Sequence, residues 1–152
     1  LGTKLACAEM IRSGVTAFAD MYYFEEYIAH ATAEAGMRAV CSQSVMKFTT
    51  PDASSYEESL EATREFVMRW KHHPLVVPSV APHAVYTCTP EILRATADLA
   101  AEFDIPLHTH ISETALEVEN LRNDTGMPVV PFMKKHGISL PPPPPPPPPT
   151  RD

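Results

Sequence analysis

Apolar residues along this chain follow two different periods, and their alternation predicts the class of fold. Four short apolar runs, each bounded by polar or turn residues, are typical of strands buried in a sheet. Between them, apolar residues recur every three to four positions, which predicts helices. The predicted strands are residues 15–19, 38–44, 75–80 and 106–110, and the predicted helices are residues 1–13, 25–35, 56–71, 90–103, 113–121 and 130–136.

Strands that alternate with helices predict a parallel sheet joined by right-handed crossovers. An open doubly wound sheet that binds a nucleotide would carry a glycine-rich phosphate turn, but the chain contains no GxG sequence. A (β/α)8 barrel of the TIM type takes about 200 to 250 residues, so the predicted units amount to about half of one. We therefore predict an α/β fold that is a partial (β/α)8 barrel of about four βα units.

Polar residues capable of chemistry gather where the predicted strands end, which is the functional edge of parallel α/β folds. His108 and His110 are two residues apart on a strand, so their side chains leave on the same face. Glu113 follows within one short turn. A neutral imidazole can bind a metal ion that acidifies water, and a carboxylate can move the proton, so the pattern indicates metal-assisted hydrolysis. The residues at the strand ends are Asp20, Gln43, Ser44, His83, His108, His110 and Glu113.

Two stretches around these residues, Ala81–Tyr86 and Pro106–Thr114, strongly resemble the amidohydrolase superfamily. Residues 14–21 and 35–38 match it as well. The branch that looks most similar comprises the 5'-methylthioadenosine/S-adenosylhomocysteine deaminases and related chlorohydrolases. The resemblance implies a (β/α)8 barrel that holds one divalent metal ion, zinc or iron.

The resemblance also implies roles for three residues. His110 would be a metal ligand, Glu113 the acid/base that activates water and protonates the leaving amine, and His83 a residue that contacts the substrate. The superfamily pattern further requires an HxH pair, a second distant histidine and an aspartate, which this chain lacks, so it resembles the middle of an enzyme. Gln43 stands where nucleoside-processing members often carry an arginine.

Each of these residues also has a structural interpretation. His83 and His110 could be histidines held by neighbouring backbone, and Glu113 could be a carboxylate in the first turn of a helix, where the macrodipole favours it. His108 is either a residue of a lower layer inside the barrel or a group that orients His110. Asp20 is expected to cap the loop that follows its strand.

Composition and charge narrow the choice of partners. The chain has 12 Lys+Arg against 19 Asp+Glu, a net charge of -7, and no basic cluster, which argues against nucleic acid. No apolar stretch approaches the roughly 18 residues that span a membrane. Cys7, Cys41 and Cys88 are widely spaced and predict reduced thiols, which together with the lack of a signal sequence predicts a cytoplasmic location. The expected partner is a small-molecule substrate, and the open edges of a half barrel also permit a homo-oligomer.

A run of prolines, Pro141–Pro149, ends the globular pattern. Consecutive prolines form an extended polyproline II rod, because they lack the N–H groups that helices and sheets use. We divide the chain into a partial amidohydrolase barrel domain, residues 1–139, and a proline-rich tail, residues 140–152, that is expected to be disordered or artefactual. An interrupted coding sequence explains this tail better than a ligand for adaptor domains does.

Two functions from different classes follow. The first is that the chain is a fragment of a metal-dependent hydrolase acting on C–N or C–halide bonds, foremost a hydrolytic deaminase of aminopurine nucleosides or related ring compounds. The second is a non-catalytic partial-barrel domain or pseudo-enzyme, because a single histidine of a four-ligand site does not hold a catalytic ion tightly. On either interpretation, the 152-residue chain alone is expected to be inactive.

Overall fold

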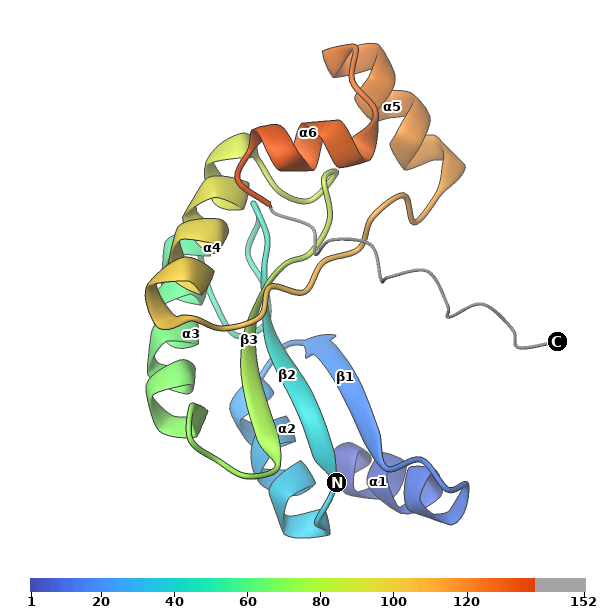
Figure 1. Cartoon of the computed structure of the whole chain (residues 1–152), viewed down its shortest axis with the longest axis vertical. Coiled ribbons are helices and arrows are strands. Elements are labelled where there is room, and N and C mark those ends of the chain that lie inside the picture. The colour runs from blue at the N-terminus through green and yellow to red at the C-terminus, as the bar shows by residue number, and fades with distance from the viewer. Residues whose placement is uncertain (139–152) are drawn as a thin grey trace, which may run out of the picture.

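The computed structural model describes residues 1–138, which form three strands and six helices. The predicted domain boundary at residue 139 and the proline-rich tail lie outside the described residues. The elements alternate along the chain as the periodicity predicts (Figure 1). In chain order they are α1 (Gly2–Arg12), β1 (Ala17–Tyr22), α2 (Glu25–Ala35), β2 (Arg38–Val45), α3 (Tyr56–Trp70), β3 (Val76–Pro82), α4 (Pro90–Phe103), α5 (Ala115–Thr125) and α6 (Val129–Lys135).

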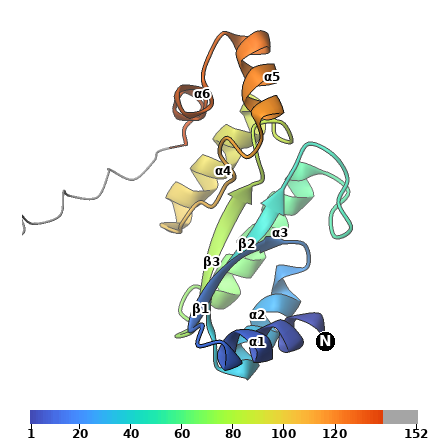
Figure 2. The same cartoon turned by 90° about the vertical axis from the view of Figure 1, so that its right-hand side faces the viewer.

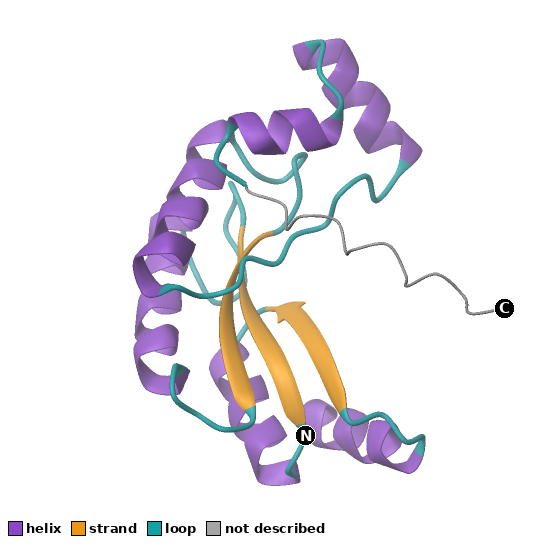
Figure 3. Ribbon diagram, viewed as in Figure 1, coloured by secondary structure: helices purple, strands orange, loops and turns teal. Residues whose placement is uncertain are grey.

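The three strands form a parallel sheet in the order β1-β2-β3. Ala17 pairs with Arg38 at the start of the first ladder, and Ala39 pairs with Val76 at the start of the second. Helices α2, α3 and α4 all lie along one side of this sheet (Figure 3). Strands in sequential order with crossovers on one side are the arrangement of successive units in a (β/α)8 barrel. The predicted α/β class and partial barrel are therefore confirmed.

The fourth predicted strand, residues 106–110, does not form a regular strand, and this part of the prediction was wrong. The segment follows β3 through a single parallel bridge, between Val80 and Leu107. The Val80 N–H donates to the Pro106 carbonyl at 3.3 Å, and the His108 N–H donates to the Val80 carbonyl at 3.0 Å. Alternate residues of β3 face this segment, and those on either side of Val80 are Pro78 and Pro82. Because proline has no N–H to donate, the ladder stops after one bridge.

Helix starts follow from specific capping side chains. Ser55 caps α3 and Thr89 caps α4, which carries Pro90 at its first position. Thr114 caps α5 in a full capping box with Glu117. Because the box places the cap at Thr114, α5 starts at Ala115, two residues later than the predicted start at Glu113.

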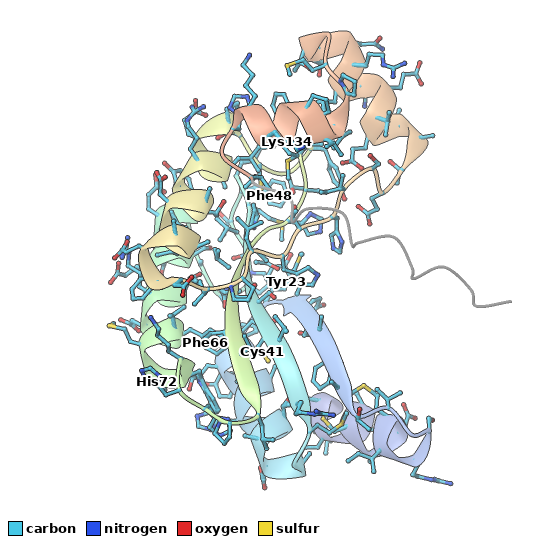
Figure 4. All side chains as sticks on the ribbon, viewed as in Figure 1. Tyr23, Cys41, Phe48, Phe66, His72 and Lys134 are labelled. Atoms are coloured by element: carbon cyan, nitrogen blue, oxygen red, sulfur yellow. The ribbon has the colours of Figure 1, made fainter. Side chains whose placement is uncertain are left out.

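The core lies between the sheet and the helices that cover it. Phe66 and Trp70 of α3 pack with Cys41 of β2 and Val76 of β3, and Figure 4 shows Phe66 and Cys41 in this layer. A larger cluster joins the carboxyl ends of β2 and β3 to α4, α5 and α6, around the fully buried Leu93 and Met133. Figure 2 shows α5 and α6 beyond the carboxyl ends of these strands. The larger cluster therefore anchors the loops that follow β3 and residues 106–110.

None of the helices within residues 1–138 is long and apolar enough to cross a membrane.

Candidate active site

His83 and His110 lie side by side just after the sheet. The His110 N–H donates to the His83 carbonyl at 3.0 Å, one residue beyond Pro82, whose missing N–H ends the regular ladder. The two rings meet edge to face with their centroids 5.0 Å apart. The structure thus brings together the predicted metal ligand and the predicted substrate-binding residue, although 27 residues of sequence separate them.

The ring of His83 is held by its own loop. Its Nδ1 lies 3.0 Å from the Thr87 hydroxyl, which also accepts the Ala84 N–H at 3.1 Å. Burial, reinforced by the neighbouring His110, lowers the pKa of His83 below its usual value. A neutral ring with Nδ1 engaged leaves Nε2 to face a ligand.

His108 lies deeper in the sheet, and its contacts favour the interpretation as a lower-layer residue. Its Nδ1 is 3.1 Å from the hydroxyl of Ser42 on β2. Its ring centroid is 6.3 Å from that of His110, farther than the His83 ring. Burial lowers the pKa of His108, so a neutral imidazole that joins the segment 106–110 to β2 is expected.

Glu113 is exposed and stands just outside α5, one residue before the cap Thr114. It is therefore not a carboxylate of the first helical turn, which was its structural interpretation. The preceding Ser112 has a left-handed backbone with φ 57°, which turns the chain sharply. The Glu113 N–H donates to the Glu117 carboxylate at 2.7 Å, and the Tyr86 hydroxyl donates to Glu113 Oε2 at 2.8 Å.

Tyr86 and Glu117 were not predicted as site residues. Glu117 had a signal, since Thr114 followed by a glutamate three residues later is a capping box. Tyr86 had none, because its partner Glu113 is 27 residues away and both lie in loops.

The side chain of Gln43 binds the loop that follows β2. Its Nε2 donates to Asp52 Oδ2 at 2.9 Å, and the Phe24 N–H donates to the same oxygen at 2.7 Å. The Thr50 hydroxyl donates to Asp52 Oδ1 at 2.9 Å. Although burial opposes ionisation, these hydrogen bonds lower the pKa of Asp52. The position where related enzymes often carry an arginine is thus a neutral amide bound to a carboxylate.

Asp20 lies within β1, two residues before its end at Tyr22, and it faces Glu25 of α2. Glu25 is 1% exposed, and its Oε1 accepts the Tyr22 N–H at 3.0 Å. Burial, with the nearby Asp20 charge, raises the pKa of Glu25 to about 9. The two carboxyls lie beside the buried Cys41 of β2. They are therefore part of the packing between the sheet and its helices and lie apart from the residues around His110.

The donor set around His110 fits part of a metal site. The imidazoles of His83 and His110 lie together, and imidazole nitrogen is a donor that zinc and iron accept. Among residues 1–138, however, no group of three or more His, Cys, Asp or Glu side chains is arranged to hold an ion. Residues 1–138 therefore do not form a complete metal site by themselves.

Comparisons with known proteins agree on one family. The family model described as "Amidohydrolase family" matches residues 1–131. The chain is 43% identical over 136 residues to a 5-methylthioadenosine/S-adenosylhomocysteine deaminase of Thermodesulfovibrio yellowstonii, a match that covers 90% of this chain and 31% of the relative. The chain thus spans about a third of the length of the curated relatives it matches.

Solved structures with a similar fold include a deaminase and a chlorohydrolase. A zinc-bound adenosine deaminase from Xanthomonas campestris superposes with a TM-score of 0.87 at 33% identity, covering 90% of this chain and 31% of that one. A zinc complex of an atrazine chlorohydrolase from Arthrobacter aurescens superposes with a TM-score of 0.75 at 24% identity, covering 89% and 35%. The second likeness concerns the fold alone.

Proposed function

This chain belongs to the amidohydrolase family, and we propose that the complete protein containing it is a metal-dependent hydrolytic deaminase. Its substrates would be aminopurine nucleosides or related aromatic ring compounds. Water replaces the ring amino group, which leaves as ammonia while the ring carbon keeps the oxygen.

One observation carries this proposal: the imidazoles of His83 and His110 lie together just beyond the carboxyl end of β3, and the charge of Glu113 acts on His83. In barrels, this end carries the chemistry. Several similar proteins are named as deaminases of adenosine-type nucleosides, which supports the proposed reaction and substrate class.

Each residue has a part. His110 would hold the metal ion through a ring nitrogen, and a bound divalent ion supplies acidified water at neutral pH. Glu113 accepts a proton from water and returns it to the departing amine, which requires an accessible carboxylate such as this one. His83, with Nδ1 bound to Thr87, presents Nε2 to the substrate ring.

We further propose that the metal is zinc or iron, that the protein is cytoplasmic, and that it forms a homo-oligomer. Zinc is favoured by the bound ion of the adenosine deaminase from Xanthomonas campestris. Free, buried Cys7, Cys41 and Cys88 suit a reducing compartment. Elemental analysis, cell fractionation and light scattering of the purified protein test the three statements separately.

The central test is ammonia release by the complete protein from adenosine, 5'-methylthioadenosine and S-adenosylhomocysteine. Wild type should release ammonia from at least one of them, and Glu113→Gln should release it at least about 100-fold more slowly, with its metal content unchanged. Glu119→Gln, an exposed glutamate of α5 with no place in the cluster, is the matched control and should behave as wild type. Full activity of Glu113→Gln would overturn the proposal.

A non-catalytic partial-barrel domain is the second candidate. It is favoured by the lack, among residues 1–138, of a group of three side chains able to hold an ion. A complete protein that contains no stoichiometric metal after purification with added zinc, and that releases no ammonia, would establish it.

A further inference from the structure

Tyr86 makes the side-chain contact that holds the carboxylate of Glu113. Its hydroxyl donates to Oε2 at 2.8 Å, while Oε1 has no hydrogen-bond partner among the described residues. The hydrogen bond and charge of Glu113 raise the pKa of the Tyr86 hydroxyl, so it keeps its proton and remains a donor. One carboxylate oxygen is therefore fixed and the other is free to exchange a proton.

The loop that carries Tyr86 is fixed independently of Glu113. The Thr87 N–H and the Cys88 N–H both donate to the Ala84 carbonyl, at 3.2 and 3.0 Å, which closes a turn around Tyr86. Lys47, from the loop after β2, donates to the Tyr86 carbonyl at 3.0 Å. The Tyr86 ring also meets the His83 ring edge to face at 5.8 Å. The hydroxyl is thus a fixed point at the end of a short, well-bonded turn.

The side chain of Glu113 requires a fixed hydrogen-bond donor to hold it in one orientation. Its backbone is fixed by Glu117, which is 4% exposed and accepts the Glu113 N–H, but its side chain is exposed and has three rotatable bonds. An exposed glutamate samples several rotamers, and each puts the carboxylate in a different place. A donor on one oxygen selects among them.

We propose that Tyr86 is a positioning residue for Glu113: its hydroxyl binds Oε2 and leaves Oε1 oriented for proton transfer. This inference rests on the proposed function, in which Glu113 is the acid/base. Tyr86 itself touches no reacting atom in this assignment, and its effect passes wholly through the carboxylate.

The test compares Tyr86→Phe with wild type in the complete protein, using the nucleoside that gives the highest ammonia release. The substitution removes one oxygen from a side chain that is 46% exposed, so the fold should be unaffected. Because the lost hydrogen bond is to a charged group but is exposed to solvent, kcat should fall roughly 5- to 30-fold. KM and metal content should change less than about twofold.

A double substitution separates positioning from a structural role. In the Glu113→Gln background, Tyr86→Phe should cause little further loss, because the group it positions no longer exists. Tyr56→Phe is the control, since it removes the same oxygen from a tyrosine at the start of α3 that has no place in the cluster around Glu113. It should leave kcat unchanged.

The outcomes are distinguishable. If Glu113→Gln is inactive while Tyr86→Phe has the kcat of wild type, the positioning role is wrong and the proposed function stands. A rise in KM with unchanged kcat would make Tyr86 a substrate contact, and a fall in thermal stability or metal content would make it structural; either result overturns the inference. Activity of Glu113→Gln would instead overturn the proposed function.

Discussion

Glu25 and Glu113 occupy equivalent places in two βα units and have opposite surroundings. Glu25 follows β1, Glu113 follows the segment that makes one parallel bridge to β3, and each stands at or just before the start of the next helix. Glu25 is 1% exposed and lies beside Asp20, whereas Glu113 is exposed and bound to a tyrosine. The same residue type at the same kind of position is thus buried in one unit and presented to solvent in the other.

The difference separates a carboxyl that is shielded from water from one that is open to it. Burial and the Asp20 charge raise the pKa of Glu25 to about 9, so it stays protonated at neutral pH. A group that holds its proton permanently and meets no solvent cannot shuttle it. Glu113 meets solvent and keeps one oxygen free, which is what an acid/base catalyst requires.

The test with the largest expected effect replaces each of the two glutamates in turn by glutamine in the complete protein. Glu113→Gln should lower kcat by about a thousandfold or more, since general acid/base groups contribute about 10²–10⁴-fold. Its thermal unfolding midpoint should stay within about 1 °C of wild type, because the side chain is exposed. Glu25→Gln should retain activity, because a neutral amide replaces a neutral carboxyl. Ammonia release and thermal melts measure both, and a Glu25→Gln variant as inactive as Glu113→Gln would abolish the distinction.

The contrast between the two glutamates was only partly predictable from the sequence. Periodicity predicted α2 at residues 25–35, which is where the structure has it, and it placed Glu25 at the helix start. It could not show that Asp20 lies against Glu25, because burial there depends on how β1 packs on α2. For Glu113, the resemblance implied the role, but the Tyr86 contact joins two loops whose approach is a property of the tertiary fold.

The irregular segment 106–110 shows a second limit of the sequence. Its apolar pattern matched a strand, but the partner residues that face it are Pro78 and Pro82 of β3. Which side of a strand a proline faces depends on register, and register is set by neighbouring strands. Apolar periodicity therefore predicted that the segment is extended but could not predict that its ladder would stop.

The buried carboxyl of Glu25 should also make the stability of the protein depend on pH, whereas the exposed carboxyl of Glu113 should not. Between pH 4.5 and 9 the folded protein holds a proton on Glu25 that the unfolded chain releases. The unfolded state thus binds fewer protons, and the free energy of unfolding falls as pH rises, by up to about 1.4 kcal/mol per pH unit from this group.

Urea unfolding of the complete protein at pH 6, 7, 8 and 9 measures this slope. Glu25→Gln should flatten it, since glutamine does not titrate, and Glu113→Gln should leave it as in wild type. Equal slopes for wild type and Glu25→Gln would mean that Glu25 is ionised in the folded protein.

Removal of the helix cap beside Glu113 should have a smaller effect. Thr114→Ala deletes the side-chain acceptor of the α5 capping box and should cost about 1 kcal/mol of unfolding free energy. Thr89→Ala removes the corresponding cap of α4 and should cost about as much. Only Thr114→Ala should also lower kcat, by a few-fold, because its backbone adjoins Glu113. Equal activity of the two variants would show that the start of α5 does not control the carboxylate.

The smallest expected effect concerns Lys47, which bonds the backbone of Tyr86. Lys47 donates to the Tyr86 carbonyl at 3.0 Å, and Lys71 donates in the same way to the Phe103 carbonyl at 2.7 Å, at the end of α4. Both bonds are exposed, so Lys47→Met and Lys71→Met should each change the free energy of unfolding by about 0.5 kcal/mol or less. Lys47, unlike Lys71, bonds the turn that carries Tyr86, so only Lys47→Met should lower kcat, by about twofold. This loss should vanish in the Tyr86→Phe background. A loss that persists there would mean that Lys47 acts on the site by another route than the Tyr86 hydroxyl.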